Sequence, residues 1–195
     1  MEVGAIPAFV GRISFSGELG YEIWVRADYQ LALYQLLMQA GAELGIRAYG
    51  ARALTSMRLE KSFGNWARDF RPIYSPGEAG LDRFIAFEKP SFVGREAALK
   101  ERAQAPQRRL VTLIVTANGA DAIGDEPVFH KDEAIGWITS GGYGHRIEKS
   151  LALAYVPASV AQAKNELEVE ILGERRPAAI AERPPYDPDG LRMRA

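Results

Sequence analysis

The sequence lacks cysteine altogether and has only two histidines among its 195 residues. The absence of cysteine excludes disulfides, thiolate metal sites, iron–sulfur ligation and cysteine nucleophiles together. His130 and His145 are fifteen positions apart, without an H-x-x-x-H spacing and without an accompanying cluster of carboxylates. We therefore expect no metal site.

The chain also lacks an excess of charge of either sign and any long hydrophobic run. Lys and Arg number 24 against 25 Asp and Glu, which gives a formal charge of -1 and a pI of about 6.2. This balance argues against a nucleic-acid-binding protein, which needs a basic surface for phosphates. No apolar run approaches the roughly 18 residues of a membrane span, and residues 1–12 lack the features of a signal peptide. We expect a soluble, cytoplasmic protein without a nucleic-acid or membrane partner.

Two familiar catalytic patterns are missing as well. The run Gly141-Gly142-Tyr143-Gly144 does not lead from a strand into a helix, so it does not predict a dinucleotide phosphate loop. We interpret this run as a hairpin turn. No G-x-S-x-G sequence is present, and neither histidine has an evident carboxylate to orient it, which argues against a serine nucleophile.

The chain does contain ample material for a core, with 47% hydrophobic residues. Residues 9–15 and 21–26 are rich in β-branched and aromatic residues, and the segment 16–20 between them holds two glycines. This pattern predicts a β-hairpin. In its second strand Glu22 lies on the face opposite to Ile23, because side chains alternate along a strand.

Helices are predicted after the hairpin. Leucines at three- and four-residue intervals predict a helix over 29–44, with Asp28 as its N-cap and Gly45 at its end. A second helix is expected over 51–61, which contains no strong helix breaker.

The pattern then changes twice along the chain. Residues 68–80 are rich in Pro and Gly and predict a long loop, followed by a strand at 84–87 and a helix at 94–105. From residue 108 onward, short strands without helices predict a small, closed or nearly closed antiparallel barrel. The predicted barrel strands are 109–116, 126–130, 133–139, 150–156, 167–172 and 177–181.

This second change indicates a domain boundary. The stretch Ala105-Pro106-Gln107 is typical of a linker, so we expect one domain over 1–105 and another over 106–195. The first domain mixes strands and helices and the second is a β-barrel. The predicted fold class is therefore α+β.

Charged residues in apolar surroundings are the remaining candidates for binding. They are Glu22 in the second hairpin strand and Arg52, Arg58 and Glu60 in the helix over 51–61. A carboxylate can accept hydrogen bonds from a planar heterocycle and an arginine can hold a carboxylate, so this set suits an amide-bearing ring with an acidic tail. Spacing alone favours a solvated or ion-paired role for the same residues.

Five segments of the chain, in order, form a longer pattern. They are F-S-G-E-L-G-Y-E at 15–22, G-A-R-A-L-T-S-M-R-L-E-K at 50–61, P-G-E-A-G-L at 76–81, F-V-G-R-E-A-A-L at 92–99 and T-S-G-G-Y-G at 139–144. This series resembles the folate-dependent aminomethyltransferase family, which includes the T-protein of the glycine cleavage system. Residues 60–72, 186–188 and 192–194 look most like the C-terminal folate part of dimethylglycine and sarcosine dehydrogenases.

The resemblance implies a partial folate-binding domain over 1–105, followed by the family's C-terminal barrel. It implies tetrahydrofolate as the cofactor, which accepts a one-carbon unit from a small methylated amine. By resemblance, Glu22 is the carboxylate that hydrogen-bonds the pterin ring, with Phe15 and Tyr21 at the same pocket. Arg52 is expected to contact the glutamate tail of the folate.

Some parts of the family pattern differ here or are missing. Phe15 replaces the usual tyrosine, and Ala53 replaces an aspartate. In the family, the aspartate thought to orient the folate lies before the position of Phe9, in a stretch that this sequence does not contain, so we assign no catalytic residue. The FAD domain of the dehydrogenase relatives is likewise outside this chain.

Two functional hypotheses follow from this pattern. The chain is either part of a tetrahydrofolate-dependent aminomethyltransferase or demethylase, or a non-catalytic folate-binding or assembly module that needs a missing N-terminal segment or a partner chain. A third branch of the superfamily, in tRNA modification and iron–sulfur assembly, carries a lysine-glycine-cysteine-tyrosine motif and is excluded by the lack of cysteine.

Overall fold

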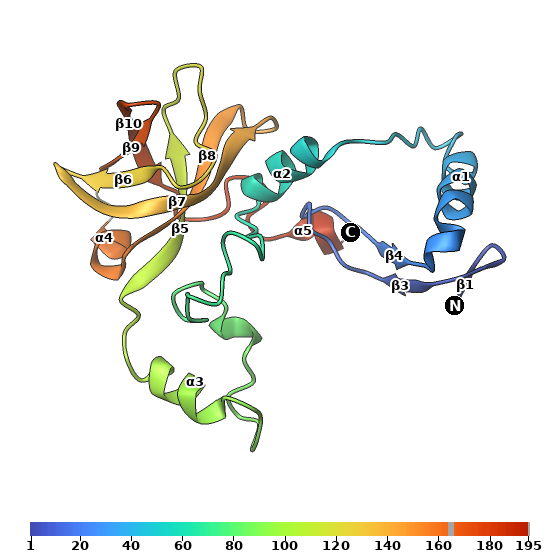
Figure 1. The fold of residues 1–195 in the computed structure, drawn as a ribbon, viewed down its shortest axis with the longest axis horizontal. Coiled ribbons are helices and arrows are strands. Elements are labelled where there is room, and N and C mark those ends of the chain that lie inside the picture. The colour runs from blue at the N-terminus through green and yellow to red at the C-terminus, as the bar shows by residue number, and fades with distance from the viewer. Residues whose placement is uncertain (164–165, 195) are drawn as a thin grey trace.

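The computed structural model describes residues 1–163 and 166–194 and shows an open N-terminal part beside a β-barrel (Figure 1). The elements before the barrel are β1 (Glu2–Val3), β2 (Ile6–Pro7), β3 (Phe9–Gly11), β4 (Glu22–Trp24), a 3₁₀ turn (Ala27–Tyr29), α1 (Gln30–Ala40), α2 (Ala51–Glu60), a second 3₁₀ turn (Asp82–Phe84) and α3 (Arg95–Arg102). The later elements are β5 (Arg108–Val115), β6 (Pro127–His130), β7 (Glu133–Gly144), β8 (Lys149–Pro157), α4 (Ala158–Ala163), β9 (Leu167–Ile171), β10 (Glu174–Ile180) and α5 (Leu191–Arg194).

Six of the described strands form the barrel. It is closed in the order β10-β5-β8-β7-β6-β9, and all of its strand pairs are antiparallel. Alternate side chains point inward and fill the interior with apolar residues, among them Leu113, Ile138 and Val169. The predicted α+β fold and the predicted barrel are confirmed.

Strand β8 is the most deeply buried strand of the barrel, because both of its faces are covered. Ala152 and Ala154 belong to the interior cluster. Leu151 and Leu153 point outward and pack against Leu59 of α2. The helix α2 therefore lies against the outside of the barrel, where the contacts of α2 with β7 and β8 hold the two parts of the chain together.

The predicted hairpin turn at Gly141–Gly144 is wrong, because these residues extend strand β7. Gly141 pairs with Ala152 and Gly144 with Lys149 of β8. The turn comes later, at residues 145–148. Gly141 is required here because a Cβ atom would stand 2.2 Å from the backbone oxygen of Ala122, in the loop after β5.

The N-terminal hairpin and the second predicted helix are confirmed. Strand β3 pairs with β4 in an antiparallel register, with Phe9 opposite Trp24 and Gly11 opposite Glu22. Both strands are shorter than predicted, so the connecting loop runs over residues 12–21. The helix expected over 51–61 is α2.

The predicted limits of the first helix are wrong. Asp28 does not cap it, because the Asp28 carboxylate pairs with Arg26 at 2.8 Å and Tyr29 holds the N-cap position of α1. The helix ends at Ala40, because the amide of Ile46 donates to the carbonyl of Gly41 at 3.0 Å and its side chain packs on that glycine. A close tertiary contact thus overrides the helical periodicity of the following residues.

The strand predicted at 84–87 is also wrong. Its first residue ends the 3₁₀ turn Asp82–Phe84, and none of the described strands pairs with it. Phe87 is instead buried beneath Arg102 of α3, whose guanidinium lies 4.4 Å from the ring centroid. The helix expected over 94–105 forms as the shorter α3.

A buried carboxylate connects α2, the following loop and the barrel. Asp69 is 0% exposed, and Nη1 of Arg58 on α2 donates to its Oδ2 at 3.0 Å. Ser140 of β7 donates to the same carboxylate at 2.8 Å, and Thr139 also donates to it. The backbone amide of Asn65 donates to Oδ2 at 2.7 Å. Burial lowers the pKa of Arg58, and the attraction of Asp69 opposes that shift.

Aromatic residues extend this contact along the loop. Tyr155 of β8 donates its hydroxyl to the backbone oxygen of Asp69 at 2.9 Å, and its ring stacks on Tyr74 with centroids 3.7 Å apart. Trp137 of β7 donates its indole N–H to the Tyr74 hydroxyl at 2.9 Å. These hydrogen bonds and the stacked rings hold the predicted loop over 68–80 on the barrel.

Replacing Asp69 tests the importance of this network. Asp69→Asn keeps the shape of the side chain but leaves the buried Arg58 guanidinium without a counter-charge. We expect the free energy of unfolding to fall by about 3–5 kcal/mol, the usual cost of removing one partner of a buried pair. Urea denaturation followed by circular dichroism measures this change.

Asp28→Asn is the matched control, because it removes a carboxylate from the exposed pair with Arg26. Its effect on the free energy of unfolding should stay within about 0.5 kcal/mol. Equal effects of the two substitutions would contradict the role assigned to Asp69.

Candidate functional site

The residues predicted to hold a heterocyclic ring lie on the N-terminal hairpin. Glu22 is exposed on β4, opposite Gly11. Phe15 is half-buried in the loop 12–21, and Tyr21 is 60% exposed at its end. Among the described residues, the Glu22 carboxylate has no hydrogen-bond or ion-pair partner. It is therefore free to accept hydrogen bonds from a ligand.

Two local hydrogen bonds form within the loop that carries Phe15. The amide of Gly17 donates to the hydroxyl of Ser14 at 3.0 Å, and the amide of Glu18 donates to Ser16 at 3.4 Å. Gly17 is buried and has φ +78°, a conformation that residues with a Cβ rarely adopt. The positive φ of this turn therefore explains why the motif has a glycine at position 17.

Arg52 lies on a different element from the hairpin residues. It is exposed in the first turn of α2 and lines a cavity of about 670 Å³ between α2, the loop after β5 and the end of β7. Tyr143 and His145 line the same cavity, and their rings meet edge to face with centroids 5.1 Å apart. None of the three hairpin residues lines it.

Hydrogen bonds of Ser56 on α2 hold the wall of this cavity that contains Tyr143 and His145. The Ser56 hydroxyl donates to the backbone oxygen of Tyr143 at 2.7 Å and accepts the amide of His145 at 3.2 Å. The side chain of Ser56 is buried, so both bonds are shielded from water. The wall therefore depends on a contact between residues 87 and 89 positions apart in the chain.

The other two charged candidates on α2 support the fold. Arg58 is engaged with Asp69, as described above. Glu60 is buried, and its Oε1 accepts the amides of Arg146 at 2.6 Å and Ile147 at 3.3 Å, which closes the turn after β7. Neither side chain is available to a ligand. Residue type and spacing did not separate these two residues from Arg52, which only the family resemblance singled out.

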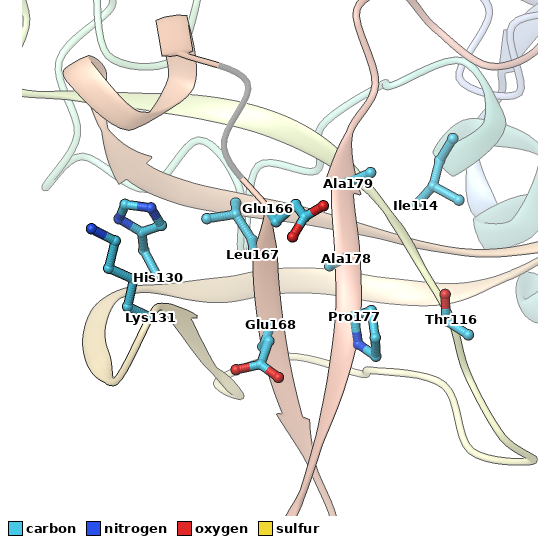
Figure 2. Close-up of a pocket in the computed structure, with 10 residues that line it drawn as sticks. All are labelled: Ile114, Thr116, His130, Lys131, Glu166, Leu167, Glu168, Pro177, Ala178 and Ala179. Atoms are coloured by element: carbon cyan, nitrogen blue, oxygen red, sulfur yellow. The ribbon is translucent and has the colours of Figure 1, made fainter.

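A second cavity, of about 740 Å³, lies on the outer face of the barrel along β9 and β10 (Figure 2). None of the predicted site residues lines it. Figure 2 shows the carboxylates of Glu166 and Glu168 pointing apart, with His130 and Lys131 beyond them. These groups do not converge on one point, so this surface does not resemble a catalytic centre.

No group of three His, Asp or Glu side chains in 1–163 and 166–194 is arranged to hold a metal ion. No helix in this part of the chain is both long enough and apolar enough to cross a membrane.

Comparisons with known proteins match both parts of the chain. Residues 1–89 match the family model described as the GCVT N-terminal domain, and residues 108–187 match the glycine cleavage T-protein C-terminal barrel domain. The mitochondrial dimethylglycine dehydrogenase of Rattus norvegicus is 42% identical over 94% of this chain and 22% of its own length. The 4-methylaminobutanoate oxidase (formaldehyde-forming) of Paenarthrobacter nicotinovorans is 37% identical over 100% of this chain and 24% of its own.

A solved structure shows the same fold. The glycine cleavage system aminomethyltransferase T from Bartonella henselae superposes with a TM-score of 0.84 and 25% identity, covering 93% of this chain and 50% of that protein. The chain thus spans half of that structure and less than a quarter of the two curated relatives.

The cavity beside Arg52 yields a prediction about its wall. Ser56→Ala removes both hydrogen bonds that join α2 to the end of β7, so the amide of His145 should exchange with solvent faster. We expect a loss of about 1–2 kcal/mol in protection of this amide, measured by hydrogen exchange with NMR detection.

Thr55→Val is the control, because it removes the neighbouring hydroxyl of α2 and leaves Ser56 in place. An unchanged His145 exchange rate in Ser56→Ala would show that the wall does not depend on this side chain.

Proposed function

Because this chain belongs to the glycine cleavage T-protein family, we propose that it supplies part of a tetrahydrofolate site for one-carbon transfer from a small methylated amine. The observation that carries the proposal is the unpaired Glu22 carboxylate. Glu60, the other carboxylate among the sequence candidates, is buried and accepts backbone amides of the fold.

The residues of the hairpin suit the pterin end of a folate. A pterin presents adjacent N–H groups along one edge, and a carboxylate accepts two such donors side by side. Glu22 provides that acceptor. Tyr21 directly precedes Glu22 in the chain and Phe15 lies seven positions before it, and both provide aromatic surface for the flat ring. Since Phe15 has no hydroxyl, its part in the site is limited to packing.

The cavity beside α2 suits the other end of the same molecule. A folate carries a benzoyl ring and a glutamate tail, which offer an aromatic face and carboxylates. Arg52 can hold a carboxylate with two parallel hydrogen bonds, and Tyr143 at the rim of the cavity offers an aromatic surface. The proposed site thus has one part on the hairpin and another on α2.

Tetrahydrofolate, when bound, would supply its N5 and N10 nitrogens as acceptors of the one-carbon unit. The described residues bind and orient such a molecule, and none of them is assigned the proton transfer. Oxidation of the amine and the choice of amine lie outside the groups described for this chain. The relatives differ in the amine that their names give, which is dimethylglycine for one and 4-methylaminobutanoate for another.

Titration calorimetry with tetrahydrofolate or its stable 5-formyl analogue tests the proposal. The unaltered chain should bind, and Glu22→Gln should weaken binding by roughly 10- to 100-fold, because a hydrogen bond to a charged group contributes about 1.5–3 kcal/mol.

Glu133→Gln on β7 is the matched control, since it also removes an exposed carboxylate from a strand. It should leave the affinity unchanged. Failure of the unaltered chain to bind, or equal affinities of the Glu22 and Glu133 variants, would refute the proposal.

A second candidate function is that of an assembly module, as the β3–β4 sheet indicates. This sheet has only two strands among the described residues, and such a ribbon is marginally stable by itself. Phe9 and Trp24, which pair across it, are 82% and 48% exposed. A partner polypeptide that adds a strand to this sheet would cover them.

Light scattering after size-exclusion chromatography tests this alternative. If the sheet is completed by another polypeptide, the isolated chain should self-associate, and Phe9→Ser together with Trp24→Ser should return it to a monomer. A monomeric unaltered chain that also fails to bind a dye for exposed apolar surface would eliminate this alternative.

A further inference from the structure

The segment after the barrel folds back onto the end of α2. The amide of Tyr186 donates to the backbone oxygen of Glu60 at 3.0 Å. The next residue, Asp187, accepts a hydrogen bond from the ammonium of Lys61, the C-cap residue of α2. Lys61 is only 3% exposed, so this ion pair is shielded from water and from salt.

The aliphatic stem of Lys61 supports the loop of the hairpin. A Cβ atom at Gly17 would lie 2.3 Å from Cγ of Lys61, which means that the backbone of the loop rests directly on this side chain. The position of Lys61 therefore determines how close the loop can approach α2.

The same carboxylate organises the last helix. Asp187 accepts the backbone amides of Leu191 at 2.9 Å and Arg192 at 3.2 Å, at the start of α5. Arg192 then donates its Nε to the carboxylate of Glu18 at 2.7 Å. Glu18 follows Gly17, so the contacts form a closed ring: hairpin loop, Lys61, Asp187, α5 and the hairpin loop again.

Two further interactions stabilise this closed ring of contacts. The Tyr186 ring lies between two cations, with Lys61 Nζ 5.2 Å and the Arg146 guanidinium 5.8 Å from its centroid. The Lys61 ammonium, with the amides of α5, lowers the pKa of the Asp187 carboxyl. Because that pKa is lower than in the unfolded chain, the contribution of Asp187 is present at neutral pH and is lost on acidification through its folded pKa.

We propose that Lys61, Asp187, Arg192 and Glu18 are positioning residues that hold the loop 12–21, and with it Phe15 and Glu22, in place for a ligand. This positioning role rests on the proposed function, because the loop is held in place for the folate proposed there. None of the four needs to touch the ligand, because they act through the backbone of the loop. The segment 182–194 thereby brings the two ends of the chain together at one site.

The short strands on either side of the loop 12–21 explain why this loop needs support from the ring of contacts. Strands β3 and β4 have three residues each and pair only with each other among the described strands. A loop of ten residues between them, 12–21, would be loosely held by so short a ribbon. The ring adds two ion pairs and a packed lysine stem at its middle, where Gly17 and Glu18 lie.

Hydrogen exchange read by mass spectrometry tests the proposal on the whole chain without ligand. Lys61→Met keeps most of the stem but removes the ammonium, and Arg192→Gln breaks the ring at its exposed side. In both variants, peptides covering 12–21 should exchange about tenfold faster, while peptides from β5 and β8 keep their protection. Arg183→Gln is the control, because it removes a pair with Asp189 in the same segment but outside the ring.

A charge reversal distinguishes positioning from general loss of structure. Glu18→Arg and Arg192→Glu should each speed exchange of the loop, and the double variant should restore its protection. Exchange of 12–21 that is unaffected by Arg192→Gln, or a double variant no better than the singles, would overturn the proposal.

Calorimetry with 5-formyltetrahydrofolate completes the test. Lys61→Met and Arg192→Gln should each lower the affinity roughly tenfold. The melting temperature of the barrel should stay unchanged. The double variant with Glu18→Arg and Arg192→Glu should recover the affinity. If the loop responds as expected but the unaltered chain does not bind, the folate site is refuted while the ring remains. If folate binds in a manner that depends on Glu22 but not on the ring, the positioning role is refuted.

Discussion

The buried carboxylate of Asp69 is the interaction on which the rest of the structure depends. An ionised side chain without exposure must be matched by several donors, and Arg58, Asn65 and Ser140 supply them from α2, the following loop and the barrel. These partners can meet only if α2 lies against the outside of β7 and β8. The carboxylate thus sets the position of α2, and α2 in turn carries Arg52 and Lys61.

The two parts of the chain differ in what stabilises them. The barrel is closed, so its strands have no open edge and its interior is filled with aliphatic side chains. The N-terminal hairpin has few packing contacts of its own and is linked to the remainder through α2 and the segment 182–194. The proposed binding site is therefore shared between a rigid support and a loop that ion pairs hold in place.

Strong local periodicity made the barrel and α2 predictable. Alternation over several residues places one face inside, and a slip of one residue would expose that whole face, so strand positions were correct to within a few residues. The failures occurred where a distant contact overrode the local pattern. Gly141 and Gly142 continue β7 because they pair with Ala152 and Leu151 of β8. Helix α1 ends early because Ile46 packs on Gly41.

The sequence by itself determined the α+β class, the barrel strands, the hairpin and the family, because these depend on local patterns and ordered motifs. Residue type and spacing did not separate Glu22 from Glu60 or Arg52 from Arg58, and only the family resemblance singled out Glu22 and Arg52. The tertiary structure decided which of the four charges are buried in the fold. Glu60 meets the amide of Arg146, 86 positions away, and Arg58 meets Asp69, 11 positions away. Both are buried, whereas Glu22 and Arg52 remain exposed. The physical reason is that the cost of burying a charge depends on which distant groups reach it, as Ser140 reaches Asp69 across 71 positions.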